Sequence, residues 1–361
     1  MKTPPEKKFI MMIPPPNVTG SLHLGHALTT AIEDTLTRWN RMRGYDTLWL
    51  PGLDHAGIAT QSVVEKKLLR DQNLRRVDMT RSDFLAKVWD WKAEYGAHIY
   101  EQFKRIGVSF DKSRFAFTLD PHMVTAVKEA FVRMWEKGTI YRSTRLVNWS
   151  SALCTAISDL EVDNIEFTGS TWVKVPGHTA TVEVGVIHSF AYPIDGSDKE
   201  IVIATTRLET MLGDTAVAVH PDDPRYTELV GKMIKHPFLD RLIPIIADGE
   251  LVQMEFGTGA VKVTPAHDKN DFDCGRRNGL PEINILTDEG KINAHGGSYE
   301  GMMRFDCRNK IEADLKERGL YRGKEDNPMK IGFCSKSKDI IEPYLKPQWY
   351  VSCADMANRA A

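Results

Sequence analysis

Two histidines stand out in the stretch Pro14–Leu28, which reads PPPNVTGSLHLGHAL. His23 and His26 are three residues apart, so on a helix both imidazoles lie on one face of the first turn. A helix N-terminus presents unpaired N–H groups and a partial positive charge, which together bind phosphate. Gly25 lies between them and leaves room where a nucleoside would approach the backbone. The stretch therefore predicts a site that holds the phosphates of a nucleotide.

Spacing alone leaves two other interpretations of these histidines open. They could be exposed side chains at an ordinary capped helix start. A His-x-x-His pair is also half of a metal site, but no third ligand follows nearby. The residues ahead of the helix favour the nucleotide site, because prolines stiffen the approach and turn-forming residues follow them. These residues are Pro14, Pro15, Pro16, Asn17 and Gly20.

A strand–helix–strand pattern surrounds the histidines. The apolar run KFIMMI (8–13) predicts a buried strand, and DTLWLPG (46–52) predicts a second one. Residues 21–41 predict an amphipathic helix, because apolar side chains recur every four residues. These side chains are Leu24, Leu28, Ile32 and Leu36. Because a helix between two neighbouring strands favours parallel pairing, we expect an α/β fold with a doubly wound parallel sheet.

The sequence changes character after about Trp149. Short β-branched runs separated by Gly, Pro and Asp follow, among them EIVIAT, TAVAVH and GAVKVT, and they predict a compact β-rich module. Helical sequence precedes this module at residues 81–138 and returns at 304–319. The run IIEPYLKPQWYV (340–351) predicts a strand that returns to the first domain.

The composition narrows the class of protein. Hydrophobic residues make up 42% of the 361 residues, the mean hydropathy is −0.33, and no apolar run approaches the ~18 residues of a membrane span. A formal charge of −2 excludes a uniformly basic nucleic-acid binder, although a local basic groove is compatible with it. Five cysteines stand far apart without a Cys-x-x-Cys pair. This argues against a disulfide framework or a structural zinc site and favours a reducing compartment.

Several longer motifs resemble the class I aminoacyl-tRNA synthetases, in the branch specific for valine and in its eukaryotic cytosolic form. PPPNVTGSLHLGHAL resembles the ATP-binding motif of this family. Five further blocks follow in the family's order: DHAGIATQ, RLVNWSSALCTAISDLEVD, ATTRLETMLGDTAVAVHPDDPRY, GTGAVKVTPAHDKNDF and IEPYLKPQWYV. The resemblance covers nearly the whole chain.

The resemblance implies a Rossmann-type catalytic domain that an editing domain interrupts. Residues 1–148 would be the first half of the catalytic domain, 149–338 the inserted editing domain, and 339–361 the return to the catalytic domain. The family's Lys-Met-Ser-Lys-Ser loop and anticodon-binding domain do not occur in this sequence. SKSK at 335–338 precedes the return, so we expect a surface turn there. We therefore expect the N-terminal portion of a longer enzyme.

The resemblance also implies the residues of a synthetic site that activates valine with ATP. ATP, with its Mg²⁺, is expected to bind at Gly20, His23, Gly25 and His26. Catalysis is expected to depend on His23, His26 and Asp54, since the Asp54 carboxylate can pair with the ammonium group of valine. Pro15, Pro16, Asn17 and Trp349 are expected to contact the valine side chain. Helix capping is the alternative for Asp54, and a core position is the alternative for Trp349.

An editing site is implied because threonine has nearly the shape of valine. The resemblance implies that the β-rich module hydrolyses Thr-tRNA(Val), and that Arg207, Lys262, Thr264, Asp268 and Asp271 form the editing pocket. Thr205, Thr206 and Thr210, at the exit of the same strand as Arg207, are expected to add polar groups for the threonine hydroxyl. Asp271 is expected to bind the ammonium group of the mischarged threonine. Asp268 begins a new helix, so helix capping is its alternative. No general base is evident, and we expect a positioned water to attack the ester.

Two other classes of function remain open from the sequence. A free-standing editing hydrolase would leave PPPNVTGSLHLGHAL without a purpose. A tRNA-binding module without chemistry is the second alternative. A reading frame that also carries the Lys-Met-Ser-Lys-Ser loop would exclude both. The expected location is the cytoplasm, with mitochondrial use open, and no membrane partner is expected.

Overall fold

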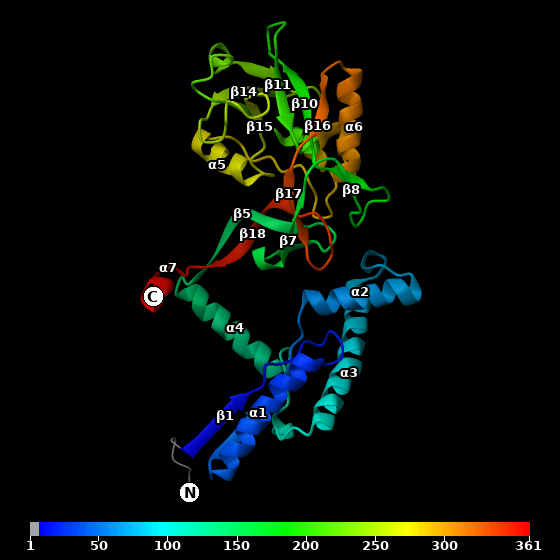
Figure 1. Cartoon of the computed structure of the whole chain (residues 1–361), viewed down its shortest axis with the longest axis vertical. Coiled ribbons are helices and arrows are strands. Elements are labelled where there is room, and N and C mark those ends of the chain that lie inside the picture. Colours follow the sequence, from blue (N-terminus) through cyan, green and yellow to red (C-terminus); the bar gives the residue numbers. More distant parts are fainter. Residues whose placement is uncertain (1–6) are drawn as a thin grey trace. The chain divides into compact units, whose positions relative to one another are not determined.

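The computed structural model describes residues 7–361, which fold into two compact units (Figure 1). Unit 1 comprises the described residues up to Ile140 together with Ser352–Ala361, and unit 2 comprises Tyr141–Val351. None of the helices within residues 7–361 has the length and apolar content needed to cross a membrane.

Unit 1 is built of helices and short parallel strands. Its strands are β1 (Lys8–Met12), β2 (Asp46–Leu50), β3 (Gly52–Leu53) and β4 (Ala116–Phe117), and its helices are α1 (Leu24–Met42), α2 (Ile58–Gln72), α3 (Arg81–Ile106), α4 (Pro121–Glu136) and α7 (Ala354–Ala360). β1 pairs in parallel with β2, and β3 pairs in parallel with β4. Since α1 links β1 to β2, the predicted strand–helix–strand unit is confirmed. The mixed α/β content is confirmed, while a doubly wound sheet stays a prediction.

Aromatic side chains fill the core of unit 1. Trp49 of β2 and Phe103 of α3 are fully buried, and Leu53 and Phe117 pack in the same cluster. The Trp49 Nε1–H donates to Glu33 Oε2 of α1 at 3.0 Å, so the one polar group of this ring has a partner. These contacts join α1, α3 and the strands into one unit.

The apolar stripe of α1 faces solvent rather than this core. Leu24, Leu28, Ile32 and Leu36 are between 40% and 85% exposed. The buried residues of the helix are Thr30, Thr37 and Asn40. Burial of Thr37 and Asn40 costs little, because their side chains donate to the Glu33 and Leu36 carbonyl oxygens one turn earlier. The predicted helix is present, but periodicity did not tell which face would be covered.

Unit 2 is rich in short strands, as the sequence predicts. The strands are β5 (Ile140–Ser150), β6 (Thr155–Ile157), β7 (Val162–Phe167), β8 (Thr171–Val173), β9 (Val182–Val184), β10 (Val186–Pro193), β11 (Glu200–Thr205), β12 (Ala216–Val219), β13 (Met233–Lys235), β14 (Leu242–Ala247), β15 (Ala260–Val263), β16 (Tyr321–Asp326), β17 (Met329–Cys334) and β18 (Glu342–Val351). The helices that matter below are α5 (Lys269–Asn278), α6 (Arg304–Glu317) and the short 3₁₀ helix η5 (Leu208–Gly213). Two sheets, β11-β10-β16 and β13-β14-β12-β15, enclose the main core.

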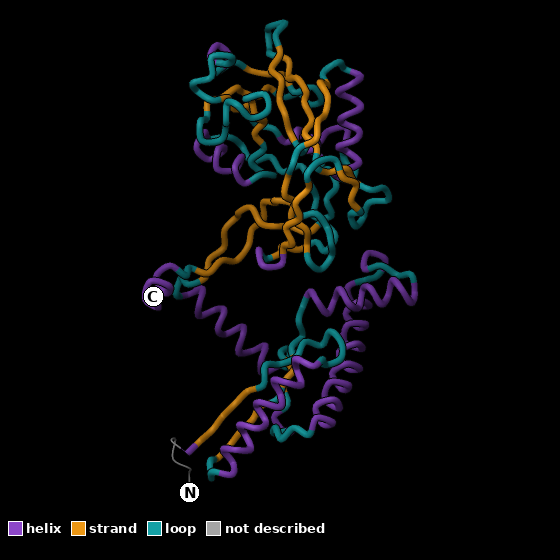
Figure 2. The backbone as a smooth tube through the Cα atoms, viewed as in Figure 1, coloured by secondary structure: helices purple, strands orange, loops and turns teal. Residues whose placement is uncertain are grey.

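A long ribbon of β5 and β18 belongs to unit 2. The two strands lie side by side (Figure 2), in a sheet of order β18-β5-β6. The run at 340–351 therefore forms the predicted strand, but this strand pairs with β5, and the chain re-enters unit 1 at Ser352. Residues 335–338 form the predicted turn, where Lys336 and Lys338 pair with Glu161 and Asp163. The functional division at residues 148 and 338 stays a prediction.

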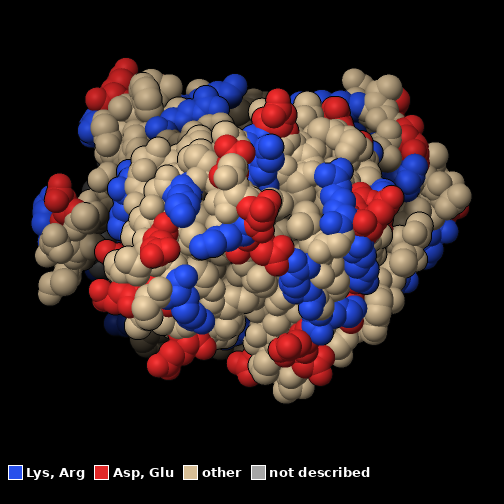
Figure 3. Space-filling model, turned by 90° about the horizontal axis from the view of Figure 1, so that it is seen from above, with Lys and Arg blue, Asp and Glu red and all other residues tan. Residues whose placement is uncertain are grey.

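Charged side chains of both signs share the surface. On the face shown in Figure 3, Lys and Arg are interspersed with Asp and Glu. Exposed ion pairs such as Arg322 with Glu200 (2.5 Å) neutralise part of this charge locally. A surface that binds the phosphates of a nucleic acid must therefore be a local feature.

Candidate functional site

The start of α1 is capped by the two histidines that the sequence singles out. His23 is the N-cap residue, and its Nδ1 accepts the Gly25 N–H at 3.1 Å. His26 completes a reciprocal capping box, because its Nδ1 accepts the His23 N–H at 3.2 Å. Helix capping and the predicted nucleotide site thus use the same two side chains.

This capping assigns the protons of both imidazoles. Because each Nδ1 accepts a hydrogen bond, each neutral ring carries its proton on Nε2. Burial and, secondarily, the neighbouring His23 lower the pKa of His26, which favours the neutral form. The ring centroids lie 3.9 Å apart. The pair therefore offers two adjacent Nε2–H donors at the positive end of a helix, an arrangement suited to phosphate oxygens.

Gly25 allows the His23 ring to fold back over the helix start. A Cβ built on Gly25 would lie 3.0 Å from His23 Cε1 and 3.1 Å from His23 Nδ1. A side chain at position 25 would therefore force the His23 ring to shift by a few tenths of an ångström, in addition to taking up the room for a nucleoside that the sequence predicts. A Cβ on Gly20 would meet nothing within 4 Å, so Gly20 serves no comparable internal contact.

A cavity of about 290 Å³ lies at this helix start. It is lined by Ile13, Pro14, Pro16, His23, Gly25, His26, Thr29, Thr30 and Phe103. The structure thus brings four of the predicted residues to one cavity, namely Pro16, His23, Gly25 and His26.

Asp54 is tied to the same segment through the backbone. Asn17 and Asp54 form a parallel β-bridge, the Asp54 N–H donates to the Pro16 carbonyl oxygen, and the Val18 N–H donates to the Asp54 carbonyl oxygen. The Asp54 side chain is 37% exposed, and its Oδ1 accepts the Ala56 N–H at 3.0 Å. Asp54 is not the cap of α2, which begins after Gly57. Its carboxylate is therefore accessible beside the proline segment.

Two other predicted residues of the synthetic site have different surroundings. Pro15 is exposed and does not line the cavity. Trp349 lies on β18 in unit 2 and is 49% exposed. Trp349 is therefore not a core residue. A core position was the alternative to a contact with the substrate.

A second cavity, of about 470 Å³, lies in unit 2 among the predicted editing residues. Seven of the eight line it: Thr205, Thr206, Arg207, Thr210, Lys262, Asp268 and Asp271. The remaining one, Thr264, is 1% exposed and lies beneath Lys262, whose Nζ donates to Thr264 Oγ1 at 2.5 Å. Residues far apart in the sequence thus meet at one pocket. The sequence interpretation did not name several further lining residues, among them Gln253, Phe256, Thr258, His267 and Asn270.

A buried carboxylate that the sequence interpretation missed neutralises Lys262. Asp214, at the end of η5, accepts from Lys262 Nζ at 3.2 Å and from Thr264 Oγ1 at 2.5 Å. Its other oxygen accepts the Tyr192 hydroxyl at 2.8 Å. Burial raises the pKa of Asp214, and these partners oppose the rise. The Lys262 side chain therefore lines the pocket while its ammonium group is paired with Asp214.

The two aspartates at the start of α5 have different surroundings. Asp268 is the N-cap, and its Oδ1 accepts the N–H groups of Asn270 and Asp271. Asp271 is buried, and its Oδ2 accepts the Thr264 N–H at 2.8 Å. Burial raises the pKa of Asp271 to about 7, opposed by Lys262. Asp268 therefore has the capping role that was its alternative. Asp271 is the buried carboxylate, and its pKa of about 7 lies close to neutral pH.

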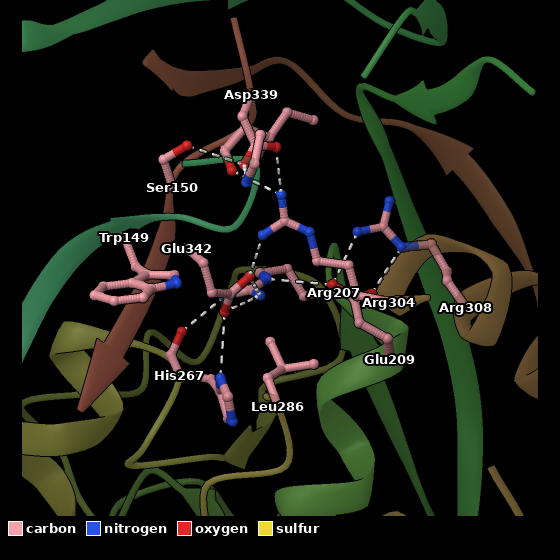
Figure 4. Close-up of polar contacts among 12 residues, drawn as sticks. Trp149, Ser150, Arg207, Glu209, His267, Leu286, Arg304, Arg308, Asp339 and Glu342 are labelled. Atoms are coloured by element: carbon pink, nitrogen blue, oxygen red, sulfur yellow. Dashed lines mark hydrogen bonds and ion pairs between the residues drawn. The ribbon is translucent and has the colours of Figure 1, made fainter. Parts of the chain in front are cut away.

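Arg207 is held in place by buried acidic partners. Its Nη2 donates to both oxygens of Glu342 at 2.6 and 2.7 Å, and its Nη1 donates to the His267 carbonyl oxygen at 2.7 Å. The neighbouring Glu209 is fully buried and makes a two-point contact with Arg308, at 2.7 and 3.0 Å (Figure 4). The hydroxyls of Thr205 and Thr210 bond to the Arg207 backbone on either side. The two threonines therefore fix the arginine at the pocket wall.

Within residues 7–361 the structure contains no group of three or more His, Cys, Asp or Glu side chains placed to hold a metal ion. His23 and His26 accordingly have no third ligand among these residues.

Comparison with known proteins gives consistent matches along the chain. The family described as tRNA synthetases class I (I, L, M and V) matches residues 1–361. The chain is 60% identical over 357 residues to the valine--tRNA ligase of Caenorhabditis elegans, with 99% of this chain and 34% of that protein covered. It is 58% identical over 359 residues to the valine--tRNA ligase of Homo sapiens (99% and 28% covered). It is likewise 58% identical over 360 residues to the mitochondrial valine--tRNA ligase of Saccharomyces cerevisiae (99% and 33% covered).

The chain spans about a third of the length of the curated relatives it matches. Among solved structures, a ternary complex of Agrobacterium radiobacter LeuRS with tRNA and LeuAMS covers 94% of this chain and 46% of that chain. The identity to it is 19% and the TM-score is 0.38, a likeness too low to inform function.

Proposed function

Because the chain belongs to the tRNA synthetases class I (I, L, M and V), we propose that it is part of a valine--tRNA ligase that also hydrolyses Thr-tRNA(Val). The relatives named above support valine as the amino acid. The observation that carries the synthetic activity is the pair of imidazoles at the N-terminus of α1, beside a cavity lined by Pro16 and Gly25.

The first step joins valine to ATP. A carboxylate oxygen of valine attacks the α-phosphorus, the bond to the β-phosphate oxygen breaks, and pyrophosphate leaves with Mg²⁺ as part of the substrate complex. The Nε2–H groups of His23 and His26 hold phosphate oxygens, as do the backbone N–H groups of the helix start. Little proton transfer is needed, so positioning and charge stabilisation account for the catalysis.

Asp54 binds the ammonium group of valine in this proposal. Its carboxylate is exposed enough to receive a ligand, and its backbone is bonded to the segment that carries Pro16 and Asn17. Pro15, Pro16 and Asn17 contact the valine side chain, and the expected contact of Trp349, which belongs to unit 2, stays a prediction. The valyl group then passes to a ribose hydroxyl of the terminal adenosine of tRNA(Val), and AMP is released.

The pocket in unit 2 supplies the discrimination that the synthetic site lacks. An apolar pocket only weakly rejects a substrate with an added hydroxyl. The known case is the valine-specific enzyme, which discriminates against threonine by about 10²-fold. A site that binds the hydroxyl and hydrolyses the ester removes the remaining error. Polar side chains surround the cavity of about 470 Å³, and they match this requirement.

Asp271 binds the ammonium group of the mischarged threonine in this pocket. It is the buried carboxylate of the wall and, unlike Asp268, it is not the cap of α5. Thr205, Thr206 and Thr210 offer hydroxyls, and Lys262 offers the one N–H donor that its contacts with Asp214 and Thr264 leave over. A water positioned in the cavity attacks the ester carbonyl, with help from hydroxyls of the substrate.

The fold and location complete the proposal. In this proposal residues 1–148 belong to the first half of a catalytic domain with a Rossmann-type doubly wound sheet, the editing domain is inserted at 149–338, and residues 339–361 lead back to the catalytic domain. The parallel pairs β1–β2 and β3–β4 support this division. The cytoplasm is the proposed location.

The test measures both activities in the full-length protein. Valine-dependent exchange of pyrophosphate into ATP should occur and should fall at least tenfold in Asp54→Ala, since one charge-assisted contact is worth about 1.5–3 kcal/mol. Hydrolysis of Thr-tRNA(Val) should be unchanged in that variant. Hydrolysis without exchange in the wild type would favour the free-standing hydrolase. Absence of both activities would favour the tRNA-binding module.

A further inference from the structure

One buried carboxylate outside the predicted set connects the elements that form the pocket in unit 2. Glu342, the first residue of β18, is 2% exposed. It accepts hydrogen bonds from the side chains of Arg207, His267 and Arg304, which belong to three other segments (Figure 4). Although burial alone would raise it, Arg207, His267 and Arg304 hold the pKa of Glu342 well below its usual range. The carboxylate is therefore charged, and its partners depend on that charge.

The contact with Arg207 sets how this side chain meets the cavity. Nη2 of Arg207 lies 2.6 and 2.7 Å from the two Glu342 oxygens, and Nη1 donates to the His267 carbonyl oxygen. A guanidinium group has five N–H donors in a rigid plane, so these contacts fix its orientation. The side chain keeps 24% of its surface exposed and lines the cavity. Glu342 thus determines which edge of the guanidinium group a ligand can reach.

The contact with His267 sets the start of α5. His267 Nε2 accepts the Ile285 N–H at 3.0 Å, so the neutral ring carries its proton on Nδ1 and donates it to Glu342 Oε1 at 3.2 Å. Asp268, the cap of α5, follows directly, and Asp271 lies in the first turn. Glu342 thereby holds both sides of the pocket wall, the arginine and the acidic helix start.

We propose that Glu342 is a positioning residue for Thr-tRNA(Val) hydrolysis, acting through Arg207 and through the His267–Asp271 turn. The inference rests on the editing activity proposed above. It differs from a purely structural role, in which Glu342 would only anchor β18.

Asp339 is a matched control for this distinction. It is 1% exposed and lies three residues before Glu342. It accepts from Arg304 Nη2 at 2.9 Å and from the Ala152 N–H at 3.0 Å. Both carboxylates therefore anchor the same segment to α6, while Glu342 in addition bonds to Arg207 and His267. Neutralising either one removes an ion pair with Arg304.

The experiment compares Glu342→Gln with Asp339→Asn in the full-length protein. Glu342→Gln should lower kcat/KM for Thr-tRNA(Val) deacylation at least tenfold, with valine-dependent pyrophosphate exchange within twofold of the wild type. Asp339→Asn should also lose thermal stability, because it removes an ion pair with Arg304, and should keep deacylation within about twofold. Equal deacylation rates for the two variants, measured where both are folded, would overturn the proposal. If Glu342→Gln does not fold, Glu342→Asp, which keeps the charge but shortens its reach, should show the same selective loss.

A double variant tests the route through Arg207. If Glu342 acts through this side chain, Glu342→Gln should lower deacylation in an Arg207→Ala background far less than in the wild type. If Glu342→Gln lowered deacylation by the same factor in the Arg207→Ala background as in the wild type, that route would be refuted. A wild type without deacylation overturns the editing function and this inference together. A wild type that loses deacylation in Asp271→Ala but not in Glu342→Gln overturns the inference alone.

Discussion

The helix start in unit 1 and the pocket in unit 2 use polarity in different ways. At α1 the groups are neutral imidazoles and backbone N–H groups at the protein surface, with His23 exposed. In unit 2 they are full charges, and Glu209, Asp214 and Glu342 are at most 2% exposed. Neutral dipoles keep their hydration at little cost, whereas buried charges need partners with good geometry. The first site therefore depends on its own short segment, and the second depends on the rest of unit 2.

The largest expected effect tests the dependence of unit 2 on its buried charges. Arg308→Ala leaves Glu209, which is fully buried, with only the longer contact to Arg207 Nε at 3.4 Å, so unfolding of unit 2 should become easier by about 3 kcal/mol, the lower end of the range for a broken buried ion pair. Urea denaturation measures this change. Arg322→Ala is the control, because it breaks the exposed pair with Glu200 and should cost at most about 1 kcal/mol. If both variants lost the same free energy of unfolding, the claim that unit 2 depends on its buried charges would be wrong.

The next effect separates ligand binding from folding at Asp271. Asp271→Ala should lower Thr-tRNA(Val) deacylation at least tenfold, because one charge-assisted contact contributes about 1.5–3 kcal/mol. Pyrophosphate exchange with valine should not change, since His23, His26 and Asp54 belong to unit 1. Deacylation and thermal unfolding are measured on the same preparation. An unchanged deacylation rate with a lowered melting temperature would show that Asp271 only stabilises α5.

A smaller effect is expected at the cap of α1. His23→Ala removes the acceptor of the Gly25 N–H and should destabilise unit 1 by about 0.5–2 kcal/mol. His23→Asn should restore most of that stability, since Asn is a favoured N-cap residue, but not the imidazole donor for phosphate. Urea denaturation and pyrophosphate exchange distinguish the two roles. Recovery of exchange in His23→Asn would mean that His23 is a cap and nothing more.

The last prediction concerns pH. Burial raises the pKa of Asp271 to about 7, above its value in the unfolded chain of about 4. The folded state therefore holds a proton that the unfolded state has lost, so the stabilising effect is complete below pH 4 and disappears as the pH rises through about 7. Asp271→Asn should remove this dependence and raise the melting temperature relative to wild type at pH 8 more than at pH 5. If the melting temperatures of the two proteins differed by the same amount at pH 5 and pH 8, the raised pKa of the buried Asp271 would be contradicted.

Sequence reasoning reached the two sites to different extents, for the reason that distinguishes them. The α1 cap lies within four residues, so its spacing could be read directly. The partners of the unit 2 charges are distant: Lys262 finds Asp214 across 48 residues, and Arg207 finds Glu342 across 135. No local pattern marks such pairs, which is why Asp214 and Glu342 were missed. Five of the editing residues, Arg207, Lys262, Thr264, Asp268 and Asp271, were assigned through the family resemblance, whereas Thr205, Thr206 and Thr210 were named as polar groups at a strand end; the roles of all eight stay predictions.

The fold shows the same limit. The strands and helices followed from apolar periodicity and turn residues, as at α1 and β12. The covered face of α1 did not follow, because the side chains of Thr37 and Asn40 donate to carbonyl oxygens within the helix and can be buried without leaving those donors unsatisfied. The partner of β18 did not follow either, since a strand's own residues do not state which edge it will join.

The contact between Gly25 and the His23 ring has a consequence for how this segment can vary. A methyl group at position 25 would press on the ring only while an imidazole is folded back over the helix start. With a short side chain at position 23 the obstacle disappears, and alanine would even suit the helix better than glycine. The two positions are therefore coupled: the effect of a substitution at position 25 depends on which residue stands at position 23.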